Sequence, residues 1–197
     1  MRALSLALAL ALGCPTTAKD TAATDNGADT GPVDTADPLE DPLADIDPSQ
    51  LDQGADPCRA PAYVTVEEVV DGDTIKVLSG RGVERVRLIG IDAPEVDHDG
   101  NWDECWAEES KAFVSDAIVD RGVWLTFDAE CEDDYDRTLA YVHTRLGDQG
   151  FLQRTLLLEG WVSAFAVSPN TSFQTIFGND EAEARAAGRG LWGACSR

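Results

Sequence analysis

Apolar and polar residues alternate in three consecutive runs, at residues 63–70, 74–78 and 83–91. This period of two is typical of half-buried β-strands. Gly72 lies between the first two runs, and Gly80 and Gly82 lie between the second and the third. Such short glycine-containing connections favour an antiparallel meander.

The spacing changes to that of a helix between residues 104 and 121, where apolar residues recur every three or four positions and Gly122 follows as a stop. The remaining pattern predicts, in order, strands over 123–127 and 139–144 on either side of an acidic loop, a short helix over 152–159, an extended segment over 161–167 and a last helix over 173–187. We therefore predict an α+β domain. A small closed barrel is one way to remove the edges of its sheet.

The segment that precedes this pattern has a different composition. Between Pro15 and Pro57 there are eleven acidic residues, one lysine and no aromatic residue. Such a segment buries too little apolar surface to offset the entropy cost of ordering it. We predict a disordered acidic linker over residues 14–57 and a folded domain over residues 58–197, which is a typical domain size.

The first thirteen residues have the pattern of a signal peptide. Arg2 is followed by a run of leucine and alanine that is too short to span a bilayer. The ending Ala11-Leu12-Gly13-Cys14 resembles a bacterial lipobox, in which Cys14 is lipidated after cleavage. The alternative is an ordinary secretory signal that leaves Cys14 as an unpaired thiol. In both cases we expect export, either to the bacterial cell envelope on a lipid anchor in the membrane or into the medium.

Export places the other four cysteines in an oxidising compartment, where disulfides form. Three pairings are possible. Cys58 and Cys195 bracket the domain, so a Cys58–Cys195 bridge would tie its ends and leave Cys105–Cys131 as an internal bridge. A zinc site is the rival interpretation, but the chain has no Cys-x-x-Cys pair and only two histidines, which makes zinc a poor fit.

Acidic residues stand at a turn in two places, in Asp71-Gly72-Asp73 and in Asp92-Ala93-Pro94-Glu95. If the two preceding strands end side by side, these carboxylates meet and form a cation site. Asp73 and Asp92 are hard oxygen donors, which suit Ca²⁺. An isolated Asp-Gly-Asp is more often only a turn, so the interpretation depends on the second motif.

Four blocks of the sequence together resemble the staphylococcal nuclease (thermonuclease) family, and they occur in that family's order: VDGDT (70–74), VRLIGIDAPE (86–95), DYDRTLAY (134–141) and GLW (190–192). The resemblance implies a five-stranded β-barrel of the oligonucleotide/oligosaccharide-binding type with three α-helices. It also implies a calcium-dependent nuclease that cleaves DNA or RNA and leaves 3′-phosphate ends.

The resemblance assigns roles to residues of this chain. The carboxylates of Asp73 and Asp92 and the main-chain carbonyl of Ala93 would hold calcium. Glu95 would orient or deprotonate the attacking water. Two further catalytic residues, Arg87 and Arg137, would bind the phosphoryl oxygens, since a guanidinium is permanently charged and grips phosphate in a bidentate way.

Tyr135 would contact the substrate near a phosphate, or else only cover the barrel. Arg85 shares a strand face with Arg87 but stands further from the acidic turn, so we assign it no role. Arg87 and Arg137 have an alternative interpretation as ordinary ion-pair partners in an acidic protein.

Several features depart from the family pattern. Asp136 and Thr138 replace the glycines that commonly flank Arg137, and Asp136 is placed to pair with it. The stacking tyrosine of the prototype has no counterpart in residues 165–170, and acidic residues replace the basic loop that follows Glu95. We therefore expect the reaction centre to be retained and the grip on substrate to be reduced.

Charge bears on the same question. The chain carries a net charge of −22, of which the predicted domain contributes −13 from 26 acidic and 13 basic residues. Affinity for nucleic acid comes mainly from basic groups, so this balance disfavours binding of a polyanion. The hypotheses are a monomeric calcium-dependent nuclease, or a non-catalytic barrel that binds calcium or an envelope partner and retains a vestigial nuclease site.

Overall fold

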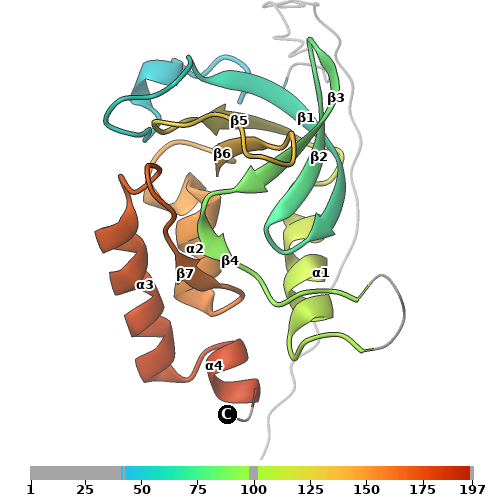
Figure 1. Cartoon of the computed structure of the whole chain (residues 1–197), viewed down its shortest axis with the longest axis vertical. Coiled ribbons are helices and arrows are strands. Elements are labelled where there is room, and N and C mark those ends of the chain that lie inside the picture. The colour runs from blue at the N-terminus through green and yellow to red at the C-terminus, as the bar shows by residue number, and fades with distance from the viewer. Residues whose placement is uncertain (1–40, 42, 98–101, 196–197) are drawn as a thin grey trace, which may run out of the picture. The chain divides into compact units, whose positions relative to one another are not determined.

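Five strands close into a barrel in the order β1-β2-β3-β6-β5, as Figure 1 shows in the upper half of the molecule. The computed structural model describes residues 41, 43–97 and 102–195. The barrel strands are β1 (Ala62–Asp71), β2 (Thr74–Ser79), β3 (Gly82–Leu88), β5 (Gly122–Thr126) and β6 (Thr138–His143). All neighbours pair antiparallel except β3 and β6, which run parallel. The predicted five-stranded barrel and the meander of its first three strands are confirmed.

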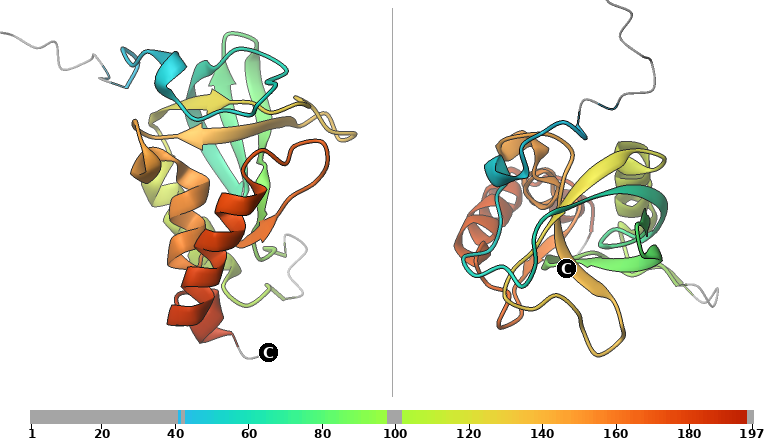
Figure 2. Two further views of the ribbon diagram at one scale, coloured as in Figure 1. Left: turned by 90° about the vertical axis from the view of Figure 1, so that its left-hand side faces the viewer. Right: turned by 90° about the horizontal axis from the view of Figure 1, so that it is seen from above.

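Helices lie below the barrel, with α1 under the β1–β2 hairpin and α2 and α3 side by side (Figures 1 and 2). Their bounds are α1 (Ala107–Ile118), α2 (Leu152–Glu159), α3 (Gln174–Ala187) and α4 (Leu191–Ala194), and two 3-10 turns are η1 (Pro48–Gln50) and η2 (Asp148–Gly150). The three predicted helices are confirmed, and α4 is a short addition. Among the described residues, no helix has the length and apolar character needed to cross a membrane.

The hydrophobic core continues from the barrel into the space between β6, α2 and α3. All six residues of β6 are buried, because helix α2 covers the face that the barrel interior does not. The carboxamide of Gln153 on α2 accepts a hydrogen bond from the N–H of Val142 at 3.1 Å and donates one to the carbonyl of Ala140 at 3.2 Å. The ring of Tyr141 on β6 then packs edge to face against Phe151 just before α2 and against Phe173 and Phe177 at the start of α3. This arrangement fixes the strand that follows the acidic loop.

The predicted strand over residues 83–91 is divided into β3 and a short strand, β4 (Gly90–Asp92). Gly90 has a φ of +85°, and a Cβ there would lie 2.5 Å from the ring of Phe177 on α3. The chain therefore turns at Gly90, leaves the barrel and pairs with β7 (Ser163–Phe165) in a separate two-stranded sheet. The turn carries Asp92 from the barrel wall to the edge of the acidic site.

The predicted linker ends too late. Residues 43–57 lie on the barrel, and Leu51 is 5% exposed. The indole of Trp124 donates a hydrogen bond to the carbonyl of Leu43 at 2.7 Å, and the N–H of Gly54 donates to the carbonyl of Phe127 at 2.8 Å. Composition missed this segment because backbone groups make most of its contacts. The earlier part of the predicted linker, with the predicted signal peptide and Cys14, lies outside the described residues.

The predicted disulfide pairing is wrong. The structure joins Cys58 to Cys131 and Cys105 to Cys195. Cys58 lies beside the acidic loop because its N–H donates to the carbonyl of Asp128 at 2.8 Å. Cys195 follows α4, which the main chain holds against Gly160, and this places it near the start of α1. Cys58 and Cys195 bracket the domain in the sequence, but that position did not predict which cysteines pair in the fold.

His143, one of the two candidate zinc ligands, is a core residue that is 1% exposed. Its Nε2 lies 3.0 Å from Oγ1 of Thr126 and 2.9 Å from the carbonyl oxygen of Asp52. Burial lowers the pKa of His143 to about 4. The imidazole is therefore neutral at physiological pH and connects residues 43–57 to the barrel.

Candidate active site

The turn between β1 and β2 holds the first carboxylate of the site. Oδ1 of Asp71 accepts a hydrogen bond from the N–H of Asp73 at 3.1 Å, so Asp71 does form the turn, as its residue type favours. Asp73 is 2% exposed, and its Oδ2 accepts from the N–H of Ala93 at 2.8 Å. A Cβ on Gly72 would overlap Oγ of Ser110 on α1, so the turn packs directly on that helix. The two acidic motifs thus meet as predicted.

Arg87 lies between the two predicted calcium-ligating carboxylates. Its guanidinium forms ion pairs with Asp73 and with Asp92, the latter at 3.0 Å, and donates to the carbonyl of Ile91 at 3.0 Å. The side chain is 15% exposed. Burial lowers the pKa of Arg87 and the charge of Asp92 opposes that shift, but a guanidinium remains protonated. Asp73 and Asp92 therefore attract positive charge to the place that the guanidinium occupies.

Glu95 lines a hollow together with Asp73, Arg87 and Arg137. Its backbone is fixed from both sides, because its N–H donates to Oε2 of Glu104 at 3.1 Å and its carbonyl accepts from the N–H of Glu104 at 3.0 Å. Partial burial raises the pKa of the Glu95 carboxyl, and the charge of Asp71 adds to the effect. A raised pKa brings a carboxylate closer to the range that suits a general base near neutral pH.

Arg137 stands at the end of a hairpin that begins at Cys131. The N–H of Leu139 donates to the carbonyl of Cys131 at 2.8 Å, and the N–H of Asp133 donates to the carbonyl of Arg137 at 3.1 Å. Asp133 then accepts from both Nε and N of Arg137, at 2.8 and 3.0 Å. The predicted partner Asp136 occupies the turn instead, with a φ of +58°.

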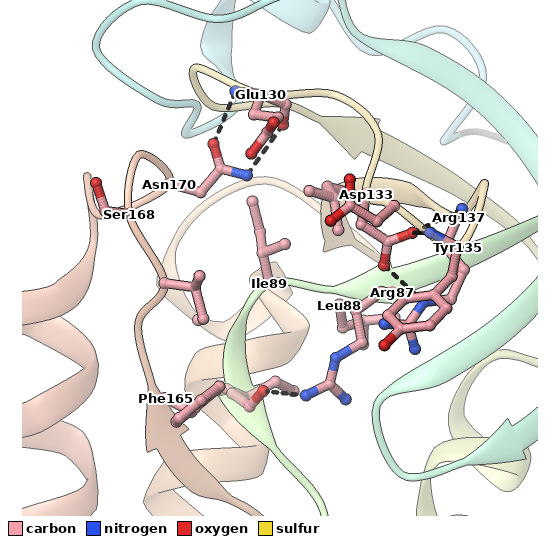
Figure 3. Close-up of a pocket in the computed structure, with 15 residues that line it drawn as sticks. Arg87, Leu88, Ile89, Glu130, Asp133, Tyr135, Arg137, Phe165, Ser168 and Asn170 are labelled. Carbon is pink, nitrogen blue, oxygen red and sulfur yellow. Dashed lines mark hydrogen bonds and ion pairs between the residues drawn. The ribbon is translucent and has the colours of Figure 1, made fainter.

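Two hollows share Arg87 and Arg137 as a common wall. The first has a volume of about 350 Å³ and contains the acidic turn, Glu95 and Arg85. The second, of about 370 Å³, is shown in Figure 3 and has Tyr135 and Phe165 at its sides. Tyr135 is 77% exposed, and the guanidinium of Arg137 lies 5.5 Å from its ring centroid. A carboxylate-rich hollow and an aromatic pocket therefore meet at two arginines.

The donor set is consistent with calcium. Within the described residues, no group of three or more histidine, cysteine or acidic side chains is placed to hold a metal ion. Asp73 and Asp92 offer two carboxylates, although Arg87 already supplies the positive charge that the buried carboxylate of Asp73 needs. Calcium accepts main-chain carbonyls and waters for its remaining ligands, so Asp73, Asp92 and the carbonyl of Ala93 fit that ion.

Besides Arg85, to which we assigned no role, three residues of the site were missed from the sequence. Asp133 fixes Arg137 and stands four residues before it, a spacing that could have been recognised in the hairpin. Glu104 fixes the backbone of Glu95 across nine residues, for which the sequence holds no signal. Phe165 presents a half-exposed ring to the second pocket, where we expected no stacking residue.

The fold and the site define a class, which is an oligonucleotide/oligosaccharide-binding barrel with carboxylates and arginines at one end of its strands. The family model described as Staphylococcal nuclease homologue matches residues 85–194, which is more than half of the chain. The chain belongs to the staphylococcal nuclease family.

Three curated relatives agree with this membership. The chain is 34% identical to a thermonuclease of Staphylococcus intermedius over 134 residues, which cover 68% of this chain and 77% of the relative. It is 34% identical over 131 residues to the SPbeta prophage-derived endonuclease YokF of Bacillus subtilis (strain 168), and 32% identical over 131 residues to endonuclease YncB of the same organism. Each of these alignments covers 66% of this chain, but only 43% and 61% of the two endonucleases, which is less than two thirds of their length.

Proposed function

We propose that this chain is a calcium-dependent phosphodiesterase that hydrolyses DNA or RNA. The observation that carries the proposal is the convergence of Glu95, Arg87 and Arg137 on one hollow that Asp73 also lines, with Asp92 paired to Arg87 beside it. The endonuclease and thermonuclease names of its relatives support the same activity. Export, with or without a lipid anchor at Cys14, is part of the proposal because the N-terminal pattern favours it.

We assign a role to each side chain from its place in the site. Arg87 and Arg137 bind the non-bridging oxygens of the phosphate and stabilise the charge that grows there during attack. Glu95 accepts the proton of the attacking water, and its raised pKa favours that role. When bound, calcium supplies Lewis-acid stabilisation of the same oxygens. Cleavage on the 5′ side of the phosphate would leave 3′-phosphate ends, by analogy with the family.

The second pocket suits a nucleobase. Tyr135 and Phe165 offer exposed rings next to the two arginines, and a base can stack on such a ring only when it is not stacked in a duplex. We infer that the substrate strand is single or locally opened at the site.

One observation favours a non-catalytic barrel. Arg87 is already paired with both carboxylates, and the chain has a net charge of −22, so substrate and calcium must both compete with existing interactions. In that case calcium or an envelope partner would bind without hydrolysis.

Cleavage of short single-stranded DNA and RNA oligonucleotides, in calcium or in EDTA, separates the two functions. The proposal predicts cleavage only with calcium, and 3′-phosphate products by mass spectrometry. Glu95→Gln and Arg87→Lys should each reduce turnover by about 100-fold or more. Glu67→Gln, an exposed glutamate on β1, is the matched control and should keep full activity. Full calcium-dependent cleavage by both site variants, or none by the wild type, would refute the proposal.

A further inference from the structure

Arg85, to which we assigned no role from the sequence, lines the reaction hollow. It stands on β3 two residues before Arg87, and alternate residues of a strand face the same side. It lines the same hollow as Glu95 and Arg137. The parallel strands β3 and β6 pair Val86 with Thr138. Arg85 and Arg137 each precede one of these paired residues, so they lie side by side on neighbouring segments of the chain.

Arg85 differs from Arg87 and Arg137 in whether an acidic side chain neutralises its charge. Arg87 pairs with Asp73 and Asp92, and Arg137 pairs with Asp133. No ion pair joins the exposed side chain of Arg85 to an acidic residue in the described parts of the chain. A free guanidinium in a protein of net charge −22 is available to an external anion.

The position of Arg85 along β3 determines where on the sheet it would contact a phosphate. Two residues of a strand span about 6.6 Å, so Arg85 lies that far along the sheet from Arg87. It lies toward the β2–β3 turn, away from Asp92 at the opposite end. A phosphate at Arg85 therefore lies further from Asp92 than one at Arg87. The neighbour of Arg85 across the sheet is Lys76, which is already paired with Glu68 at 2.6 Å, so the unpaired positive charge at this place is that of Arg85.

We propose that Arg85 forms a second phosphate subsite, which binds a phosphodiester of the substrate strand next to the one that is cleaved. The proposal rests on the proposed function, because it takes the hollow to hold a nucleic-acid strand. Arg85 contributes binding of longer substrates and takes no part in the reaction itself. It supplies part of the grip that the acidic loop after Glu95 does not.

The test measures binding separately from cleavage. In the Glu95→Gln background, which should cleave at least about 100-fold more slowly than wild type, fluorescence anisotropy with calcium gives the Kd of a labelled single-stranded octanucleotide and of a labelled dinucleotide with one phosphodiester. Adding Arg85→Gln should weaken octanucleotide binding by about 3- to 30-fold, and dinucleotide binding by less than about 2-fold. The slope of log Kd against log salt for the octanucleotide should fall by about 0.7, the value expected for one lost contact to a single strand.

Arg121→Gln is the matched control. Arg121 is also exposed, lies just before β5 and outside both hollows, and has no ion pair among the described residues. It should leave both affinities within about 2-fold. Equal losses from Arg85→Gln and Arg121→Gln, equal losses for the two ligands, or no loss would each overturn the subsite.

The wild-type chain, assayed for cleavage in parallel, keeps the two proposals distinguishable. A chain that does not cleave but loses octanucleotide binding on Arg85→Gln refutes hydrolysis and supports the subsite. A chain that cleaves, with Arg85→Gln leaving both KM and Kd unchanged, supports hydrolysis and refutes the subsite.

Discussion

The guanidinium of Arg87 forms ion pairs with both Asp73 and Asp92, the two carboxylates assigned to calcium. The same arginine is assigned to the substrate phosphate. Since one guanidinium does not serve both partners fully, its release from the carboxylates would favour calcium and phosphate together. Calcium and substrate should therefore bind with positive coupling.

Replacing Arg87 by glutamine should raise the calcium affinity measured without nucleic acid, because it removes the internal competitor for both carboxylates. We expect a Kd that is about 5- to 50-fold tighter by isothermal calorimetry, within the usual range of coupling between sites. Arg121→Gln removes the same charge elsewhere and should change the Kd by less than about 2-fold. Unchanged or weaker calcium binding in Arg87→Gln would show that Arg87 does not compete.

The buried imidazole of His143 should make stability depend on pH. Its pKa falls from 6.5 to about 4 on folding, so the unfolded chain takes up a proton below pH 6.5 that the native state refuses. Stability is thus lost as the pH falls from 6.5 toward 4, by about 2 kcal/mol at pH 5 relative to pH 8. Urea unfolding of wild type and His143→Gln at both pH values isolates this contribution, since the carboxylates titrate in both proteins. Equal losses in the two proteins would contradict the assignment.

Leu51 should anchor residues 43–57 to the barrel. The side chain is 5% exposed, and truncating a buried leucine typically costs about 2–5 kcal/mol. We expect Leu51→Ala to lower the free energy of unfolding by about 2–3 kcal/mol in urea, whereas Gln53→Ala, at an exposed position two residues later, should cost less than about 0.5 kcal/mol. Equal stability of the two variants would show that Leu51 does not anchor residues 43–57, and would support the predicted domain that begins at Cys58.

The two disulfides should differ in their effect on activity more than on stability. They close loops of similar length, with sequence separations of 73 and 90, so chain entropy gives each about 4.5 kcal/mol. Cys131 also begins the hairpin that carries Arg137. Replacing Cys58 and Cys131 by serine should therefore lower kcat several-fold under conditions where both variants are folded, and replacing Cys105 and Cys195 should not. Equal kcat values in the two double variants would show that this bridge only stabilises the fold.

The parts of the fold that local pattern determines could be predicted from the sequence. Alternation located the barrel strands, and the spacing of Ser110, Val114 and Ile118 located α1, since each depends on residues close in the chain. Gly90 was harder to interpret, because the residue that forces the turn there is Phe177. The disulfide pairing likewise depends on tertiary placement, which spacing does not contain.

The candidate site shows the same division. Asp73, Asp92, Arg87, Glu95 and Arg137 were predicted from motifs, and the structure brings them to one end of the barrel. Arg85 was dismissed because its distance from the acidic turn was judged along one strand alone. Its proximity to Arg137 arises from the parallel pairing of β3 with β6, which no local pattern indicates.

We assign calcium binding and hydrolysis to different side chains of one site. Calcium calorimetry and single-turnover cleavage of a single-stranded oligonucleotide, made on wild type, Glu95→Gln and Asp73→Ala, test this assignment directly. We predict that Glu95→Gln binds calcium within about 3-fold of wild type and cleaves about 10²- to 10⁴-fold more slowly, while Asp73→Ala loses both. Cleavage by Glu95→Gln at the wild-type rate would contradict the account.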